Sequence, residues 1–259
     1  MLAATHPSRP TLGGVSARLR VGACQTPEIL GDLDQALRVI EAFAAQADAQ
    51  GVQLLLFPEC FLQGYLVQEE HLREHALRLD AGPFAAVLRR LARIEQTLVL
   101  GVIEEAAGRY FNTAAVITRG QLVGRYRKTH LLPGETLFEA GDAYPTFELH
   151  GVRFGINICS DTQFAEAAAP VAAQGARLLL VPAQNMMRRA AALEWKDRHH
   201  SLRTDRVRET GMWLVSADVT GERDEHRVGW GPTSVISPGA EVVAQMPLMT
   251  TGMVVADID

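Results

Sequence analysis

The 259-residue chain has only three cysteines, and none of them lies in a Cys-x-x-Cys pair. Cys24, Cys60 and Cys159 are too few and too widely spaced to form a disulfide framework of the kind that holds small secreted domains together. A reducing compartment is therefore expected, and we predict a cytoplasmic protein.

Long apolar runs are also absent. The best candidate, 167–187, is interrupted by Pro170, Arg177 and Pro182, whereas a helix that spans a bilayer needs about 20 uninterrupted apolar residues. Residues 1–17 lack the apolar core of a secretory signal and are rich in proline, glycine, serine and threonine. They are predicted to form a flexible N-terminal tail, and no membrane partner is expected.

The chain has no long basic run, and its 25 Lys and Arg residues against 30 Asp and Glu residues give a formal net charge of −5. Nucleic acid is not an expected partner, because binding to phosphate backbones needs clustered positive charge. Three common enzyme signatures, G-x-S-x-G, G-x-x-x-x-G-K-[ST] and G-x-G-x-x-G, are missing as well. Their absence removes the enzyme classes that these signatures mark.

What is present is ordinary globular composition, with 47% hydrophobic and 21% charged residues, and residues 18–259 are predicted to form one domain. Short β-rich runs alternate with helical patterns, which predicts an α/β fold. Neighbouring strands at 113–119 and 121–127, joined at Gly120, indicate a mixed sheet. The other expected strands are 21–25, 52–57, 98–104, 152–158, 176–181, 212–217, 233–237, 241–245 and 253–258, and the expected helices are one capped by Asp32 and ended by Gly51, then 67–79, 83–95, 164–174 and 193–209.

Three of the expected strands are followed by a reactive side chain: Glu59, Lys128 and Cys159. Ligand sites in open α/β sheets lie beyond the C-terminal ends of the strands. Each residue taken alone has a plain structural interpretation, since a cysteine after an apolar strand is usually a small buried hydrophobe. Together they supply a nucleophile, a base and a fixed cation, which are the groups that acyl transfer through a thioester requires.

The chemistry explains why these three residue types would occur together. A thiol with an ordinary pKa of about 8.5 is mostly protonated at neutral pH, so a base such as Glu59 must take its proton. The protonated carboxyl can then return that proton to an amine leaving group. Lys128 would face the developing oxyanion together with the backbone N–H of Ser160, and one such donor contributes about 3 kcal/mol.

The segments F-P-E and R-K-x-H-L and the cysteine after an apolar strand resemble, in order and approximate spacing, the catalytic segments of the carbon–nitrogen hydrolase (nitrilase) superfamily. The resemblance extends from Arg20 to Asp259. It implies that Glu59 is the general base, Lys128 the oxyanion stabiliser and Cys159 the nucleophile. It also implies a four-layer αββα sandwich with two mixed β-sheets, no metal ion or cofactor, and a homodimer or larger homo-oligomer.

The resemblance further implies a second glutamate that positions the lysine. Glu135 is the better candidate for it, and Glu139 is the alternative. The chain departs from the family after Cys159, where Ser160 and Asp161 stand in place of the bulky or aromatic residue of many members. The pocket wall is therefore expected to be more open there.

The function implied by this resemblance is hydrolysis of a non-peptide carbon–nitrogen bond in a small carboxamide, with release of ammonia or an amine. N-carbamoyl hydrolysis is the alternative, and nitrile hydrolysis is disfavoured because nitrilases of the family tend to have longer C-terminal extensions. Arg188, Arg189 and Arg227 could receive an anionic group, although solvation at the surface is the simpler role. The loops expected to set specificity are 65–70, 184–189 and 221–230.

Two other functional classes are considered. The sequence H-L-R-E-H beginning at His71 matches a zinc peptidase pattern, but a solvated helix over 67–79 explains the same residues without a third ligand. His199 and His200 likewise are interpreted as an exposed helix face. A catalytically inactive scaffold with this fold is the remaining alternative, and it would have no need for an intact catalytic trio.

Overall fold

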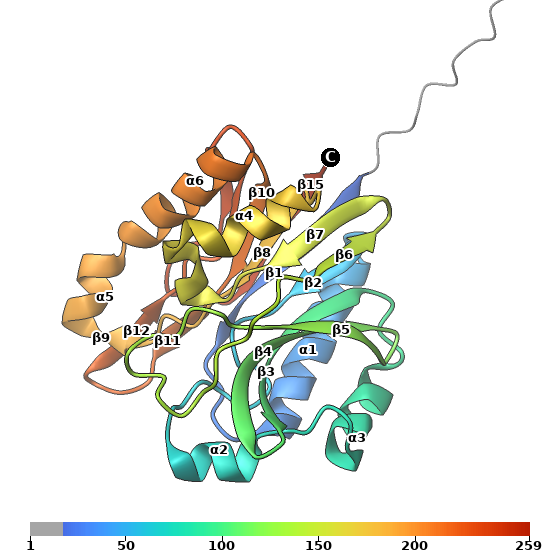
Figure 1. The fold of residues 1–259 in the computed structure, drawn as a ribbon, viewed down its shortest axis with the longest axis vertical. Coiled ribbons are helices and arrows are strands. Elements are labelled where there is room, and N and C mark those ends of the chain that lie inside the picture. Colours follow the sequence, from blue (N-terminus) through green and yellow to red (C-terminus); the bar gives the residue numbers. More distant parts are fainter. Residues whose placement is uncertain (1–17) are drawn as a thin grey trace, which may run out of the picture.

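The computed structural model describes residues 18–259, so the predicted tail at 1–17 lies outside the described residues. Figure 1 shows strands gathered at the centre of the molecule with helices outside them. The strands of the first sheet, in spatial order, are β5 (Gln121–Arg127), β4 (Arg109–Thr118), β3 (Thr97–Ala106), β2 (Leu54–Leu56), β1 (Leu19–Pro27), β11 (Val219–Glu222), β12 (Arg227–Trp230) and β9 (Met187–Arg188), with β15 (Gly252–Ile258) also paired to β1.

The second sheet contains six strands. In spatial order they are β14 (Val242–Gln245), β13 (Ser234–Ile236), β10 (Trp213–Ala217), β8 (Leu178–Pro182), β7 (Val152–Ile156) and β6 (Thr146–Leu149). Both sheets are mixed: β1 and β2 pair in parallel while β3 and β4 pair antiparallel, and β7 and β8 pair in parallel while β6 and β7 pair antiparallel.

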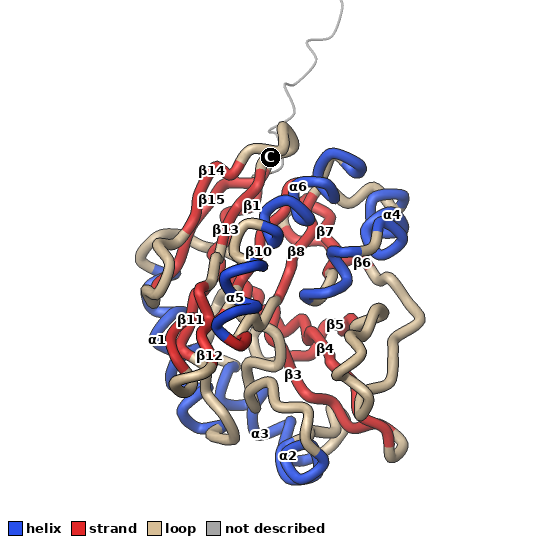
Figure 2. The backbone as a smooth tube through the Cα atoms, turned by 90° about the vertical axis from the view of Figure 1, so that its left-hand side faces the viewer, coloured by secondary structure: helices blue, strands red, loops and turns tan. Residues whose placement is uncertain are grey.

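Helices cover the outer face of each sheet. They are α1 (Leu33–Asp48), α2 (Glu69–His75), α3 (Gly82–Leu91), α4 (Ala165–Ala173), α5 (Arg189–Trp195) and α6 (Arg198–Thr210), with a 3-10 helix, η1 (Cys159–Gln163). Figure 2 shows α1 on one side of the strands and α4 and α6 on the other. The predicted four-layer αββα sandwich is therefore confirmed. None of the helices in residues 18–259 is both long and apolar enough to cross a membrane.

The hydrophobic core lies in three layers, and the pleat of the strands distributes side chains among them. Leu54 and Leu56 of β2 belong to the layer between the sheets, whereas Leu55 belongs to the layer under α1 and α3. In β8, Leu178 and Leu180 also belong to the layer between the sheets. Because both faces are covered, these strands read as continuous apolar runs. Burial of each leucine contributes roughly 1.5–3 kcal/mol.

Helix α1 begins and ends as its sequence predicts. The side chain of Asp32 accepts a hydrogen bond from the backbone N–H of Gln35 at 2.8 Å, which satisfies one of the free donors at the helix start. Gly51, with φ of +66°, turns the chain away after the helix. The buried face consists of Ala36, Leu37, Ile40, Phe43, Ala44 and Ala47.

Two features differ from the sequence predictions. The helix expected over 193–209 is divided into α5 and α6, which are separated at Lys196 and Asp197. Helix α5 contacts β12 of the first sheet, while α6 contacts β10 and β13 of the second, and one straight helix could not pack on both. The strands β6, β9, β11 and β12 were not expected, because each is a run of two to four residues with no continuous apolar stretch.

Candidate active site

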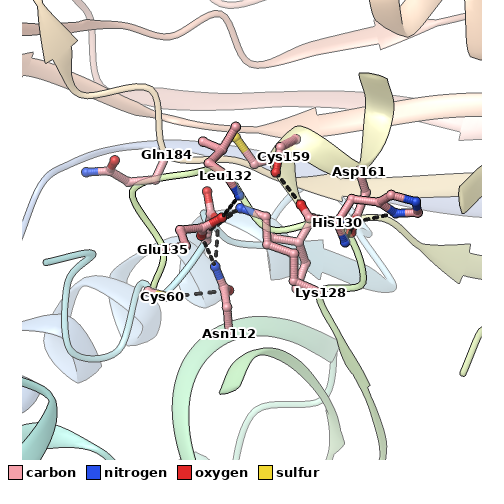
Figure 3. Close-up of polar contacts among 12 residues, drawn as sticks. Cys60, Asn112, Lys128, His130, Leu132, Glu135, Cys159, Asp161 and Gln184 are labelled. Carbon is pink, nitrogen blue, oxygen red and sulfur yellow. Dashed lines mark hydrogen bonds and ion pairs between the residues drawn. The ribbon is translucent and has the colours of Figure 1, made fainter. Parts of the chain in front are cut away.

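Three strand ends from the two sheets meet at one cavity. Glu59 follows β2 and Lys128 follows β5 of the first sheet, and Cys159 follows β7 of the second. All three residues line a cavity of about 200 Å³. Figure 3 shows the end of Lys128 beside Cys159, with Glu135 and Asn112 on its other side. The structure therefore brings together the three residues that the sequence selected.

Lys128 lies between two carboxylates. Its Nζ atom is 2.8 Å from Oε1 of Glu59 and 2.9 Å from Oε1 of Glu135. The side-chain amide of Asn112 donates to the same two oxygens, at 2.7 and 3.3 Å. The backbone N–H of Leu132 donates to the second oxygen of Glu135 at 2.7 Å. No hydrogen bond from residues 18–259 reaches Oε2 of Glu59, so this oxygen can accept a proton.

Burial and neighbouring charges shift the pKa values of Glu59 and Lys128. Less than 3% of Glu59, Lys128 and Glu135 is exposed. Burial raises the pKa of Glu59, and the charge of Lys128 opposes this shift. For Lys128, burial acts to lower the pKa, but the nearby carboxylates of Glu59 and Glu135 outweigh it and raise the pKa above its ordinary value. The lysine therefore stays a cation.

The thiol of Cys159 is held in its protonated form. Burial raises its pKa well above the usual range, and the nearby charge of Glu59 acts in the same direction. A thiol of this kind does not ionise by itself at neutral pH. Attack by this sulfur would therefore need a base, and Glu59, which has a free carboxylate oxygen, lines the same cavity.

Cys159 occupies the first position of η1 with a backbone φ of +45°. A residue other than glycine in this left-handed region costs roughly 1–2 kcal/mol and persists only where its surroundings hold it. Two contacts hold this turn. Thr162 donates its hydroxyl to the carbonyl oxygen of Cys159 at 2.7 Å, and the N–H of Ile158 donates to Asp161 at 2.8 Å.

The carboxylate of Asp161 joins this turn to the loop that carries Lys128. Its Oδ2 accepts from the N–H of Ile158 and from the hydroxyl of Tyr126, both at 2.8 Å. Its Oδ1 accepts from the N–H of His130 at 2.8 Å and from both the N–H and the hydroxyl of Thr129, at 3.3 and 3.2 Å. The fully buried Asp161 thereby fixes the two segments relative to each other.

A second carboxylate lies behind Cys159. The thiol of Cys159 donates to the side-chain oxygen of Asn185, with a sulfur–oxygen distance of 3.9 Å. Asn185 is in turn held by Asp218, which accepts its backbone N–H at 2.9 Å and also its side-chain amide. Arg203 forms an ion pair with Asp218 at 3.7 Å. Asn185 follows β8 and Asp218 follows β10, so five strand ends contribute to the site.

The structure also gives the positions of the other residues that the sequence analysis selected for the site. Ser160 lines the cavity, and its hydroxyl donates to the carbonyl oxygen of His130 at 2.8 Å. Of the two candidates for the second glutamate, Glu135 contacts Lys128 and Glu139 is exposed. A separate hollow of about 490 Å³ is lined by Arg188, Arg189 and Arg227, and it shares no lining residue with the cavity at Cys159.

Comparison with known proteins decides the family. A model of the carbon-nitrogen hydrolase family matches residues 20–259. The chain belongs to the carbon–nitrogen hydrolase family. The predicted family membership is thereby confirmed, and membership agrees with the sandwich fold.

Curated relatives of this carbon–nitrogen hydrolase include amidases. The omega-amidase NIT2 of Homo sapiens is 29% identical over 231 residues, which covers 84% of this chain and 80% of that protein. An (R)-stereoselective amidase of Pseudomonas sp is 29% identical, covering 82% of this chain and 73% of that one. A nitrilase of Pyrococcus abyssi is 30% identical, covering 90% and 86%.

Solved structures give the same family. An amidase from Nesterenkonia sp. superimposes with a TM-score of 0.81 at 27% identity, covering 93% of this chain and 90% of that one. A variant of that amidase carries the acetamide moiety of fluoroacetamide covalently at its active-site cysteine, and it matches with a TM-score of 0.81 at 26% identity, covering 93% and 90%. The relatives thus include an enzyme whose cysteine forms covalent adducts.

The histidine interpretations from the sequence hold only in part. The helix expected within 67–79 is present as α2, with Glu69, Glu70, Arg73 and Glu74 exposed. His71 itself is buried, however: its ring donates to the carbonyl oxygen of Gly64 at 3.0 Å and lies 4.7 Å from the ring of His75. Within residues 18–259 no group of three or more His, Cys, Asp or Glu side chains is arranged to hold a metal ion. His199 is not on an exposed face either, because it lines the cavity at Cys159.

Sequence reasoning missed three polar residues around the cysteine. Asp161 was noted only as a departure from the family, and Asn185 only as part of a loop. Asp218 was not noted at all, although it directly follows an expected strand, and that position was the available signal. Their importance comes from contacts between segments far apart in the chain, which spacing does not reveal.

Proposed function

We propose that this carbon–nitrogen hydrolase cleaves a small carboxamide through a thioester on Cys159. One observation carries the proposal: a cysteine, a free carboxylate oxygen on Glu59 and a lysine held by two glutamates all border a single small cavity. These groups are what nucleophilic acyl transfer needs, and each comes from a different strand end.

The reaction has two balanced halves. In the first, Glu59 takes the thiol proton while the sulfur of Cys159 bonds to the amide carbon. The carbon–nitrogen bond then breaks, and the leaving nitrogen takes the proton from Glu59, so ammonia or an amine departs. In the second half, Glu59 takes a proton from water, whose oxygen attacks the thioester carbon. The carbon–sulfur bond breaks, the acid leaves, and the proton returns to sulfur.

Lys128 stabilises the negative charge that develops on the substrate oxygen in both halves, with the backbone N–H of Ser160 as a second donor. Glu135 has a different role. Because it holds the amino group of Lys128 through one oxygen and the backbone of the following loop through the other, it positions the lysine. We assign to Glu135 this supporting role in catalysis.

The relatives support an amide substrate. The named activities among them are omega-amidase, stereoselective amidase and nitrilase. The solved amidase that resembles this chain has been captured with an acetamide group on its cysteine. An N-carbamoyl compound is the second candidate, since its carbonyl carbon is attacked in the same way, and a nitrile is the third.

The test compares wild type with Cys159→Ala on a panel of small amides, carbamoyl amino acids and nitriles. We expect turnover of at least one amide by wild type and none by the variant. The matched control is Cys24→Ala, which removes a fully buried thiol outside the site and should keep activity. Wild-type activity in Cys159→Ala would exclude the thioester route.

Mass spectrometry addresses the intermediate directly. Brief mixing with a substrate amide, followed by acid quenching, should add the acyl mass to the peptide that contains Cys159. If no amide is turned over and Cys159 also resists stoichiometric alkylation, the inactive-scaffold alternative gains support. Turnover of carbamoyl amino acids alone would select the second candidate.

We also propose a cytoplasmic homo-oligomer. The three cysteines in the described part of the chain are free, which suits a reducing compartment, and the family resemblance implies at least a dimer. Light scattering coupled to size exclusion would give the mass in solution. A single 28.2 kDa species at micromolar concentration would count against the oligomer.

A further inference from the structure

The cavity above Cys159 has an apolar wall and carries little charge. Apart from Glu59, Lys128 and Cys159, the lining consists of uncharged polar residues, one histidine and an apolar group. The apolar group is Leu132, Met186, Met187, Trp195 and Leu202. Hydrophobic side chains are therefore available to the acyl group of a substrate bound at the sulfur.

Lys128, the one cation among the described lining residues, already forms ion pairs with two carboxylates. Lys128 is within 3 Å of a carboxylate oxygen of both Glu59 and Glu135, so its charge is more than balanced locally. An anionic group placed farther along the cavity would find these two carboxylates near it and no unpaired cation among the described lining residues. Burying a carboxylate without a partner is strongly unfavourable.

His199 does not supply a positive charge. It lines the cavity, and its ring lies 5.5 Å from that of Trp195. Burial, together with the positive charge of Arg203, lowers the pKa of His199 to about 3. The imidazole is therefore neutral at any pH at which the protein would work, and it can offer hydrogen bonds but not an ion pair.

Neither Arg203 nor the arginines of the separate hollow offer a free cation to the cavity. Arg203 is buried behind the site and binds Asp218 and the hydroxyl of Ser216. In the separate hollow, Arg189 is 2.9 Å from Glu222 and Arg227 is 3.0 Å from Asp224. Arg188 is exposed and next to Met187 in β9, so their side chains point to opposite faces of that strand.

We propose that the substrate of this hydrolase is an amide with an uncharged, largely apolar acyl group, and that amides whose acyl group ends in a carboxylate are rejected. This inference rests on the proposed amide hydrolysis at Cys159. Selectivity comes from the wall of methionine, leucine and tryptophan together with the absence of an available cation among the described lining residues.

The test uses two amides of matched shape: 4-methylpentanamide, and succinamate, in which a carboxylate replaces the isopropyl end. We expect the ratio of kcat/KM to favour the neutral amide by about a hundredfold or more, because the carboxylate must lose its water without gaining a cation. The preference should persist at about 0.5 M salt, since a buried group is little screened. Equal turnover, or faster turnover of succinamate, would overturn the inference.

Variants locate the selectivity in the cavity. Met187→Arg places a cation in the apolar wall and should raise kcat/KM for succinamate by about tenfold, the order of one charge-assisted contact. Met187→Gln is the matched neutral control and should give no such gain. Arg188→Gln should leave both substrates unchanged. A loss of succinamate turnover in Arg188→Gln would assign anion binding to the arginine hollow and contradict the inference.

The outcomes separate this inference from the proposed function. Turnover of both amides with no preference refutes the substrate class and leaves amide hydrolysis standing. Turnover of neither amide, with no acyl adduct on Cys159 from any amide in the panel, refutes amide hydrolysis and the substrate class with it. The comparison in wild type needs no variant, so a Met187→Arg protein that fails to fold does not affect it.

Discussion

Replacing Asp161 with asparagine tests whether the buried carboxylate holds the nucleophile in place. Asparagine has the same shape but only one accepting oxygen. If this oxygen takes the Oδ1 position, it keeps the bonds from the backbone of Thr129 and His130. The amide group then takes the Oδ2 position, where it faces the N–H of Ile158 and the hydroxyl of Tyr126.

The loss of stability depends on which of these two donors can find another acceptor. The hydroxyl of Tyr126 can rotate to donate to Thr129, 3.0 Å away, and accept from the new amide. The N–H of Ile158 cannot rotate, so it is left buried against another donor. This costs about 2 kcal/mol, and in a protein of this size the Tm falls by roughly 4–8 °C. The opposite orientation is worse, because it leaves two backbone donors unpaired.

Activity should fall with stability, because Ile158 directly precedes Cys159. A displacement of the sulfur by a fraction of an ångström is expected to lower kcat by about tenfold or more, with little change in KM. Tyr126→Phe is the matched control: it removes one bond to the same oxygen, should cost about 1 kcal/mol, and leaves Ile158 paired. The assay is kcat and KM on the best amide, with Tm from scanning calorimetry. An Asp161→Asn protein with the Tm and kcat of wild type would refute the reasoning.

The other predictions concern charge and pH. Lys128→Met should lower kcat by about a hundredfold or more, measured on the same amide, because the oxyanion loses its cation; a loss below tenfold would contradict this role. Since burial raises the pKa of Glu59 above 4.5, the acid limb of the kcat/KM profile should have its midpoint above pH 4.5, and a midpoint below that value would exclude Glu59 as the base. Because the pKa of His199 is lowered to about 3, the unfolded chain binds a proton at this residue before the folded protein does as the pH falls below about 6.5. In urea unfolding, wild type should therefore lose stability relative to His199→Gln between about pH 6.5 and pH 3. If the two plots of unfolding free energy against pH are parallel, the ring is not a neutral buried group. The hydrogen bond to Asp161 raises the pKa of His130 above 6.5, so protonated His130 stabilises the fold fully below that pH, and this stabilisation is lost as the pH rises through the raised pKa. The free energy of unfolding of His130→Gln should therefore lie farther below that of wild type at about pH 5.5 than at about pH 9. The reverse order would refute the assignment.

Continuous apolar runs made much of the fold predictable. The run around Leu54 to Leu56 is apolar on both faces because one face meets the second sheet and the other meets α1 and α3. Such a strand needs no alternation to be recognised, only its length and the turn that ends it. The short strands β9 and β12 gave no such signal, because they depend on pairing with each other and with β11.

The catalytic trio was found in the sequence because each member follows a strand and the three segments occur in a family order. Glu135 was also within reach, since it is only seven residues from Lys128 and close to the same loop. The roles of these residues stay predictions until the variants are measured. Asp161, in contrast, matters because four of its five hydrogen bonds come from Tyr126, Thr129 and His130 in a distant segment, and no local pattern encodes them.

His199 shows why the histidines were misread. The charged neighbours of this residue in sequence, Lys196, Asp197 and Arg198, suggested a solvated helix face. The break between α5 and α6 changes the direction of the chain there, so the ring of His199 is turned toward the cavity while those neighbours stay exposed. A single uninterrupted helix, as the sequence suggested, would have placed the residue differently.

The pairing of β1 with β15 has a consequence for how the molecule forms. Leu19 lies opposite Ile258 and Gln25 opposite Gly252, so the two strands that are farthest apart in sequence are neighbours in the first sheet. During synthesis on a ribosome, β1 is therefore made well before β15, the strand that covers its edge. Contacts of such long range slow folding, and during that delay the uncovered edge is open to pairing with other chains.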